Sequence, residues 1–260
     1  MKRELGVTAM RIRDLAHVTI ERTSFPSAGG VLCGLLYRSG MPSTCVVLCH
    51  GYSAGKHNVD SLAFHLAADG FAALAFDFLG HKLGASEGPL ARAEDLIANA
   101  LDAVTWAALH SGAERIVIGG HSMGAATAIG AAVESTIIQG VIAMATSLDR
   151  HRSSEDNPLV LGLANRMAYV DGPPPAEITG AMDRCTARVG EIAPRPLLVV
   201  AGKRDALVAP SSVQRLFDAA REPKTFELID ATHTDCAERA RFVVVKWLRE
   251  RGFGQAALNG

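Results

Sequence analysis

A serine at position 122 has a glycine two residues away on each side. The stretch IVIGGHSMGAATAIG, residues 116–130, begins with β-branched residues that predict a strand and ends with small residues that predict a closely packed helix. Gly120, Ser122 and Gly124 thus give the pattern Gly-x-Ser-x-Gly at a strand-to-helix turn. Such a turn exposes the serine hydroxyl above a sheet, and side chains at the two glycine positions would collide with it. The pattern predicts that Ser122 is a nucleophile.

Two other glycine-rich turns between a strand and a helix do not fit these residues. A phosphate-binding loop ends in Gly-Lys-Ser or Gly-Lys-Thr, whereas Gly124 is followed by two alanines. A dinucleotide-binding turn needs glycine at its first, third and sixth positions, and counting from Gly119 the third position is His121. The serine turn is the interpretation that remains.

The sequence His-Ser-Met-Gly at positions 121–124 resembles the nucleophile elbow of the α/β-hydrolase family, and the resemblance spans nearly the whole chain. It implies that a nucleophile, an acid and a histidine follow one another along the chain. Asp205, which ends a Gly-x-x-Asp sequence after the apolar run PLLVVAG, matches the acid, and His233, in the loop after TFELID, matches the histidine. Asp149 is the alternative acid, because some family members carry it one strand earlier. Asp230 lies too close to the histidine in sequence to be chosen.

The three residue types complement one another chemically. A serine hydroxyl is a weak nucleophile at neutral pH, so a base must take its proton as the attack begins. Histidine can accept this proton and later return it to the leaving group. An aspartate holds the imidazole in the required tautomer and stabilises its protonated form. Ser122, Asp205 and His233 therefore predict acyl transfer through an acyl-serine intermediate.

The resemblance also implies an oxyanion hole built from two backbone N–H groups. One belongs to Met123, the residue after the nucleophile. The other belongs to Tyr52 in the sequence His50-Gly51-Tyr52-Ser53, which is similar to the family's His-Gly-x motif. We expect Gly51 to permit a close approach of the backbone and His50 to support the loop.

One loop departs from the family's pattern. Many relatives carry Asp-x-x-Gly-His-Gly-x-Ser after the fourth strand, but the corresponding stretch DFLGHKLGASEG, residues 77–88, has two more residues between Asp77 and Ser86. We expect this loop to keep its structural function, while its contribution to the rim of the pocket stays open.

Strands and helices must alternate to position these residues. Short β-branched runs separated by longer helical patterns predict a mostly parallel eight-stranded sheet with helices on both faces. Residues 18–25 and 31–37 predict an opening hairpin, and further strands are expected at 45–49, 71–78, 115–120, 140–147, 196–202 and 225–230. Helices are expected at 60–68, at 93–109, after Ser122, and at 237–251, where Phe242, Val245 and Leu248 recur at helical spacing.

The segment 148–194 interrupts this alternation. It begins with the polar DRHRSSEDN, becomes apolar in PLVLGLANRMAYV and continues with DGPPP, whose prolines predict an extended turn. The segment is too short for a separate domain, and we expect either a small lid-like insertion or a plain long connection. The chain is thus expected to be a single α/β-hydrolase domain over residues 1–260.

The composition argues against several classes of partner. With 26 basic and 27 acidic residues the formal net charge is −1, so neither nucleic acid nor an anionic membrane surface is an expected partner. No apolar run approaches the ~20 residues that span a bilayer, and no signal peptide is visible. The five cysteines are an odd number, and three lie in apolar runs, which favours buried free thiols and a cytoplasmic location. A homo-oligomer is compatible with the sequence.

Hydrolysis of a small-molecule ester is the expected reaction. A serine nucleophile argues against the dehalogenase and epoxide-hydrolase branches of the family, and the apolar residues 158–170 favour small to medium apolar acyl or aryl groups. Amidases or peptidases, C–C hydrolases and haloperoxidases share the elbow, and residues 18–37 resemble the dienelactone-hydrolase-like and peptidase-like branches. A ligand-binding receptor on this fold is the non-enzymatic alternative. No cofactor is expected, and His233-x-Asp235-Cys236 is a weak metal signal without a second ligand cluster.

Overall fold

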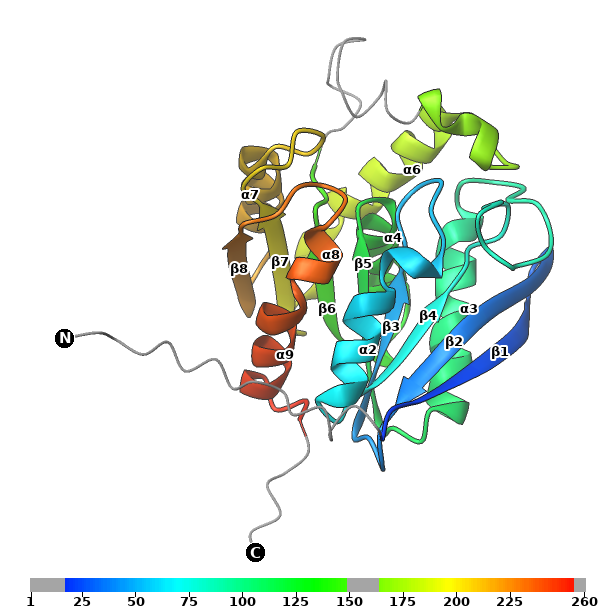
Figure 1. Ribbon diagram of the computed structural model, residues 1–260. Helices are drawn as coiled ribbons and strands as arrows, with labels where there is room; N and C mark the ends of the chain where they lie inside the picture. The colour runs from blue at the N-terminus through cyan, green and yellow to red at the C-terminus, as the bar shows by residue number, and fades with distance from the viewer. Residues whose placement is uncertain (1–16, 149–163, 255–260) are drawn as a thin grey trace, which may run out of the picture.

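Eight strands form one sheet in the order β1-β2-β4-β3-β5-β6-β7-β8 (Figure 1). The structure is a computed structural model and describes residues 17–148 and 164–254. The strands are β1 (Thr19–Ser27), β2 (Gly30–Arg38), β3 (Thr44–Cys49), β4 (Ala72–Phe76), β5 (Arg115–His121), β6 (Ile138–Met144), β7 (Leu197–Gly202) and β8 (Lys224–Ile229). β2 is antiparallel to β1 and β4, and the other neighbouring pairs are parallel. The mostly parallel sheet and its opening hairpin are confirmed.

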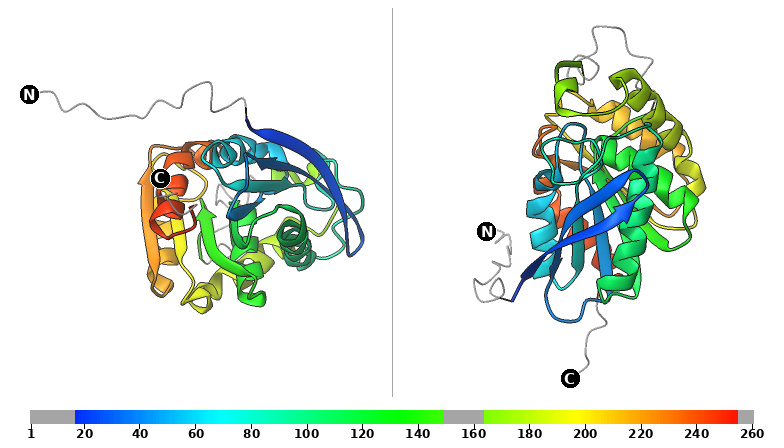
Figure 2. Two further views of the ribbon diagram at one scale, coloured as in Figure 1. Left: turned by 90° about the horizontal axis from the view of Figure 1, so that it is seen from below. Right: turned by 90° about the vertical axis from the view of Figure 1, so that its right-hand side faces the viewer.

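Helices cover both faces of the sheet (Figure 2). One face is covered by α3 (Asp95–His110), α4 (Met123–Glu134), α6 (Pro175–Ala187) and α7 (Pro210–Ala219), and the other by α2 (Asp60–Ala68), α8 (Cys236–Arg239) and α9 (Arg241–Glu250). Each face has its own apolar core, and β3, β4 and β7 are buried at every residue. Because these strands are enclosed on both faces, their sequences are continuous apolar runs rather than alternating patterns.

The end of the chain differs from the single helix expected over residues 237–251. The helix divides at Ala240 into α8 and α9. Val245 and Leu248 are buried as their spacing predicts, but Phe242 is 65% exposed. The prediction is wrong for Phe242 because the buried face of α9 also carries Val244 and Trp247, which turns Phe242 towards solvent.

The second half of the segment 148–194 keeps to the strand–helix alternation, which corrects the interruption expected there. Residues 175–187 form α6, and a 3-10 turn η4 (Val189–Ile192) completes the crossover from β6 to β7. α6 packs closely on α4, since a Cβ at Gly130 would lie 2.8 Å from Sγ of Cys185. The prolines of DGPPP begin this helix rather than an extended turn: Pro174 precedes it, and Pro175 is its first residue, a position that proline favours.

The first half of that segment falls mainly outside the described residues, which resume at 164. Residues 164–174 contain a 3-10 turn η3 (Met167–Tyr169) and lie against the loop that follows β4. Asp171 N–H donates to the carbonyl of Gly80 at 2.8 Å, and Leu90 N–H donates to the carbonyl of Asp171 at 2.9 Å. That the segment 148–194 contributes a lid stays a prediction.

The five cysteines are free thiols. Cys45, Cys49, Cys185 and Cys236 are buried and Cys33 is half-buried, so the expectation of buried thiols holds for four of them. Among the helices of residues 17–148 and 164–254, none is long and apolar enough to cross a membrane.

Candidate active site

The topology brings the predicted site residues to one edge of the sheet. β3 pairs with β4 on one side and with β5 on the other, so the chain reverses its direction of progress at β3. Open α/β sheets bind ligands beside such a switch point, at the carboxyl ends of the strands. The loops after β3 and β5 carry Tyr52 and Ser122, and those after β7 and β8 carry Asp205 and His233. These loops lie at the upper end of the sheet in Figure 1.

Ser122 occupies a sharply turned position between β5 and α4. Its backbone has φ 55° and ψ −113°, a combination that L residues rarely adopt. A Cβ at Gly120 would lie 2.3 Å from the carbonyl carbon of Gly124, and a Cβ at Gly124 would lie 2.3 Å from the carbonyl oxygen of Cys49. Both distances are far below normal contact between non-bonded atoms. The turn itself therefore requires both glycines of the motif.

Backbone strain is concentrated at the same edge of the sheet. In the part of the chain that the structure describes, three non-glycine residues have a left-handed φ: Ser53 at 56°, Ser122 at 55° and Ala145 at 52°. They follow β3, β5 and β6, and the Ser122 N–H donates to the carbonyl of Met144 at 2.9 Å. Such conformations cost about 1–3 kcal/mol each and tend to occur at functional sites.

His233 and Asp205 form a hydrogen-bonded pair. Nδ1 of His233 lies 2.8 Å from Oδ2 of Asp205, whose side chain is fully buried. The other carboxylate oxygen accepts hydrogen bonds from the N–H groups of Leu207 at 2.9 Å and Val208 at 2.7 Å. With both oxygens held in place, the carboxylate favours the tautomer of His233 that is protonated at Nδ1. Nε2 is then the nitrogen that can accept a proton.

The acid and histidine loops are also joined through their backbones. Lys203 N–H donates to the carbonyl of Ile229 at 2.8 Å, and Arg204 N–H donates to the carbonyl of Ala231 at 2.9 Å. Gly202 allows this approach, because a Cβ there would lie 2.6 Å from the carbonyl oxygen of Ala231. The relative position of the two loops is thus fixed by main-chain bonds as well as by the side-chain pair.

Asp235 closes the turn around His233. Its Oδ1 accepts hydrogen bonds from the backbone N–H and the hydroxyl of Thr232, both at 2.6 Å, and its Oδ2 pairs with Arg239. The bonds from Thr232, followed by the one from Arg239, lower the pKa of Asp235 to about 2. Asp235 is therefore a turn residue, and no group of His, Cys, Asp and Glu within the described ranges could hold a metal ion.

The two backbone N–H groups expected to form the oxyanion hole follow the neighbouring parallel strands β3 and β5. Met123 begins α4, so its N–H has no acceptor within the helix. The Tyr52 N–H has no hydrogen-bond acceptor among residues 17–148 and 164–254. Gly51 permits a tight turn here, since a Cβ there would lie 3.1 Å from Nδ1 of His121. Both N–H groups are thus available to a ligand.

His50 supports this loop, as its sequence context predicts. Its Nδ1 donates to the carbonyl of Gly51 at 2.8 Å, and its Nε2 accepts the N–H of Phe78 at 3.0 Å. Burial lowers the pKa of His50 to about 4, which keeps the ring neutral and leaves Nε2 able to accept. The residue therefore ties the loop after β3 to the chain after β4.

The segment 164–174 also contacts the loop after β3. The guanidinium of Arg166 donates through Nε to the hydroxyl of Ser53 and through Nη2 to the carbonyl of Ser53 at 3.4 Å. It stacks over the ring of Tyr169 at 5.1 Å. Ser53 is one of the three strained residues and directly follows Tyr52.

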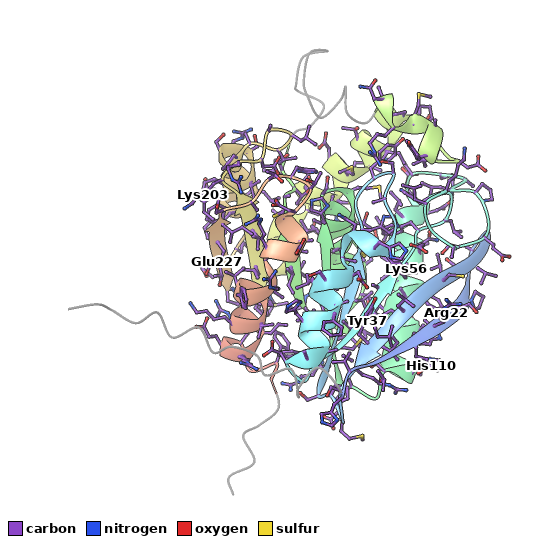
Figure 3. The ribbon with its side chains drawn as sticks, viewed as in Figure 1. Arg22, Tyr37, Lys56, His110, Lys203 and Glu227 are labelled. Carbon is purple, nitrogen blue, oxygen red and sulfur yellow. The ribbon has the colours of Figure 1, made fainter. Side chains whose placement is uncertain are left out.

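The lengthened loop of residues 77–88 is held by a buried ion pair. Oδ2 of Asp77 lies 2.5 Å from Nζ of Lys56 and accepts the N–H of Ala85 at 2.7 Å, while Oδ1 accepts the Lys56 N–H at 2.6 Å. Burial alone would raise the pKa of Asp77, but the bonds from Lys56 and Ala85 outweigh it and lower the pKa. Lys56 begins the 3-10 turn η1 (Lys56–Asn58) in the loop after β3 and is labelled in Figure 3. The loop keeps a structural function despite its length.

The sequence offers Asp149 and Asp230 as alternative acids. Asp149 lies outside the described residues. Asp230 is 69% exposed at its side chain and pairs with Arg204 at 2.7 Å. Asp205 is the carboxylate that contacts His233.

His121 is not among the residues that the sequence predicts for the site, yet it contacts His233. Its ring centroid lies 4.8 Å from that of His233, and its Nε2 lies 2.7 Å from the His233 carbonyl oxygen. Its Nδ1 lies 3.1 Å from the side-chain amide oxygen of Asn58. Burial, followed by the proximity of His233, lowers the pKa of His121 to about 3. Its place next to Ser122 is the one signal in the sequence that could have found it.

Comparison with known proteins gives the same fold. A family model described as "Serine aminopeptidase, S33" matches residues 40–170, about half of the chain. The polyketide transferase ATR5 of Stachybotrys chlorohalonatus is 25% identical over 276 residues, which cover 85% of this chain and 92% of that protein.

Solved structures match over most of their length. The Pyrococcus furiosus esterase Pf2001 has a TM-score of 0.68 and 22% identity, covering 92% of this chain and 95% of that one. The α/β hydrolase GrgF from Penicillium sp. sh18 has a TM-score of 0.69 and 20% identity, covering 90% of this chain and 97% of that one. At these identities, the similarity to solved structures shows a shared fold.

Proposed function

The chain belongs to the α/β-hydrolase family whose model is described as serine aminopeptidase, S33, and on that premise we propose that it is a serine hydrolase of small carboxylic esters. The family and the fold support a hydrolase of the esterase type. The proposal is that Ser122 is its nucleophile, that Asp205 and His233 complete a triad, and that the acyl or aryl group of the substrate is apolar and small to medium in size.

The contact between His121 and His233 carries this proposal. His121 immediately precedes Ser122, and its Nε2 lies 2.7 Å from the carbonyl oxygen of His233. His233 in turn is bonded to Asp205 at 2.8 Å. These two contacts support the assignment of a strained serine, an imidazole and a buried carboxylate, from three separate loops, to one catalytic site.

The reaction would proceed in two acyl-transfer steps. Ser122 Oγ attacks the ester carbonyl carbon while Nε2 of His233 takes its proton, and the carbonyl oxygen gains the negative charge. The N–H groups of Tyr52 and Met123 would donate to this oxygen, and loss of one such donor costs about 3 kcal/mol of transition-state stabilisation. The leaving alkoxide takes the proton from His233, and water then attacks the acyl-serine by the same route.

The apolar side chains near this edge support an apolar substrate. Met167 is 56% exposed and Tyr169 is 43% exposed, both on the segment beside the loop after β4. Large exposed apolar side chains beside a catalytic edge suit an apolar acyl or aryl group. We also propose that the segment 148–194 contributes a small lid, that the enzyme needs no cofactor, and that it acts on a small molecule in the cytoplasm.

Cleavage of an amide or peptide bond is the second candidate, because the family model is described as an aminopeptidase. The same triad would serve either bond. Matched p-nitrophenyl esters and p-nitroanilides of one acyl group separate the two, and we expect faster turnover of the ester. Because the chain is similar to a polyketide transferase, the same assay is repeated with an added alcohol, which competes with water for the acyl group.

Replacement of the nucleophile tests the proposal directly. Ser122→Ala should abolish ester hydrolysis and labelling by a fluorophosphonate probe while the melting temperature stays near that of the wild type. Turnover by Ser122→Ala near the wild-type kcat would contradict the assignment of Ser122.

A further inference from the structure

We infer that His121 is a positioning residue, whose ring holds the main chain at His233 so that the catalytic imidazole faces the nucleophile. This inference rests on the proposed function, because it assigns His121 to the same reaction. In this proposal His121 acts through the position of His233, and not through contact with the substrate or proton transfer to it.

His121 joins three segments that are far apart in the sequence. Its backbone ends β5 and leads directly into Ser122. Its Nε2 contacts the carbonyl of His233 at 2.7 Å, in the loop after β8. Its Nδ1 contacts Asn58 at 3.1 Å, and the same amide oxygen of Asn58 accepts the Gly51 N–H at 3.2 Å in the loop after β3. The ring is 4% exposed, so it is enclosed by the segments it connects.

The acceptor character of a backbone carbonyl fixes the proton on His121. The His233 carbonyl can only accept, so Nε2 must carry the hydrogen and donate it. Burial keeps the ring neutral, since it lowers the pKa of His121 to about 3, and Nδ1 is therefore unprotonated. The Asn58 oxygen already accepts the Gly51 N–H, and it cannot donate to Nδ1. No hydrogen then lies between Nδ1 and the Asn58 oxygen, so the bond from Nε2 to the His233 carbonyl is the contact that carries the positioning function.

Two contacts define the orientation of His233. Asp205 holds the imidazole through Nδ1 at 2.8 Å, and His121 holds the carbonyl of the same residue at 2.7 Å. With one contact on the ring and one on the main chain, rotation of the residue about either contact is opposed by the other. Removal of the main-chain contact would let the imidazole drift, and a misplacement of about 1 Å can lower a rate about 100-fold.

Replacement of His121 by glutamine or by asparagine distinguishes the contact made by Nε2 from the contact made by Nδ1. The side-chain nitrogen of glutamine reaches about as far as Nε2 of histidine, whereas that of asparagine reaches about as far as Nδ1. His121→Gln can therefore still donate to the His233 carbonyl, and His121→Asn cannot. His110→Asn is the matched control, because His110 lies at the end of α3, away from these loops (Figure 3).

We expect His121→Asn to lower kcat about 30- to 100-fold with KM changed less than about 2-fold, and His121→Gln to recover kcat to within about 5-fold of the wild type. His110→Asn should leave both constants unchanged. Melting temperatures of all four proteins are measured alongside. Wild-type kcat in both His121 variants would overturn the inference, and so would an equal loss in both variants. If the asparagine variant fails to fold, the glutamine variant still decides, since a loss above about 30-fold at unchanged melting temperature overturns the inference.

The proposed function and this inference can fail separately. If the wild type neither hydrolyses esters nor reacts with a fluorophosphonate, or if Ser122→Ala stays active, the proposed function is wrong. If those two proteins behave as expected and the His121 variants do not, the error lies in the positioning function alone.

Discussion

The elbow, residues 120–124, and the histidine loop, residues 230–235, contribute to one proposed site but are shaped by different forces. Every residue of the elbow is buried, and its course is imposed by exclusion, because neither Gly120 nor Gly124 has room for a Cβ. In the histidine loop, only Ala231 is buried. Its course is set by hydrogen bonds to the side chains of Asp205, Asp235 and His121 and to the backbone at Arg204. Steric exclusion therefore shapes the elbow, whereas polar contacts shape the histidine loop.

The largest expected effect is on the rate of ester hydrolysis, when the carboxylate of Asp205 that contacts Nδ1 of His233 is replaced. Asp205→Asn keeps the size of the side chain but can present an N–H group to Nδ1, which favours the wrong tautomer of His233. In serine triads this costs about 10⁴-fold in kcat. We expect a loss of that order in ester hydrolysis with little change in melting temperature.

A parallel measurement on Asp149→Asn is the control for the acid. That variant should hydrolyse esters at close to the wild-type rate. If Asp149→Asn were the inactive protein and Asp205→Asn the active one, the carboxylate would be misassigned, and the contact of Asp205 with His233 would not be the one that catalysis needs.

A smaller effect, on stability rather than chemistry, is expected in the elbow. Gly124→Ala places a Cβ 2.3 Å from the carbonyl oxygen of Cys49 and 2.5 Å from that of His50, and neither backbone atom can move without disturbing β3. We expect the free energy of unfolding to fall by about 3 kcal/mol or more, measured by denaturant titration.

Gly180 is the matched control for this substitution. It lies within α6, where the nearest atom to a new Cβ is the flexible end of Arg184 at 3.4 Å. Gly180→Ala should stabilise the protein by up to about 1 kcal/mol, because alanine favours a helix over glycine. Equal stability of the two alanine variants would show that the elbow tolerates a side chain and that exclusion does not shape it.

The smallest effect is expected for the turn residue of the histidine loop. Asp235 has a folded-state pKa of about 2, below the value of about 3.9 for an unfolded aspartate. Its hydrogen bonds therefore add stability above about pH 4, and this contribution is lost as the pH falls through 2. We expect the melting temperature of Asp235→Asn to lie at most about 2 °C below that of the wild type at neutral pH, because the group is near the surface.

The decisive measurement is how the difference in melting temperature between the wild type and Asp235→Asn changes with pH. The two melting temperatures should converge as the pH falls from about 4 to about 2, where the wild-type carboxylate also becomes protonated. A difference that stays constant over this range would mean that the carboxylate does not hold the turn around His233.

The contrast between the two regions also explains what could be predicted from the sequence. The elbow is encoded within five consecutive residues, so its motif and the steric reason for Gly120 and Gly124 are visible in the sequence. The strands could be predicted equally well, because strands that are buried on both faces have unbroken apolar sequences such as that of β7. The course of the histidine loop depends on residues more than twenty positions away, such as Asp205, and a family resemblance was needed to connect them.

Other features could not be predicted because they arise from contacts between segments that are far apart in the sequence. The contact of His121 with His233 joins β5 to the loop after β8, and no local pattern announces it. The polar start and the prolines of the segment 148–194 suggested an interruption, whereas α6 begins at Pro175 and covers α4. Phe242 has helical spacing, but its exposure depends on how α9 is rotated on the sheet.

The two bonds from Arg166 to Ser53 give the molecule a mechanical link. Ser53 already holds a strained main chain, with φ at 56°, so little slack is left on the Tyr52 side of it. If residues 164–174 move outwards while this contact is kept, Ser53 and the adjacent Tyr52 N–H would move with them. Entry of a bulky ester would then disturb the proposed oxyanion hole until the contact of Arg166 with Ser53 breaks.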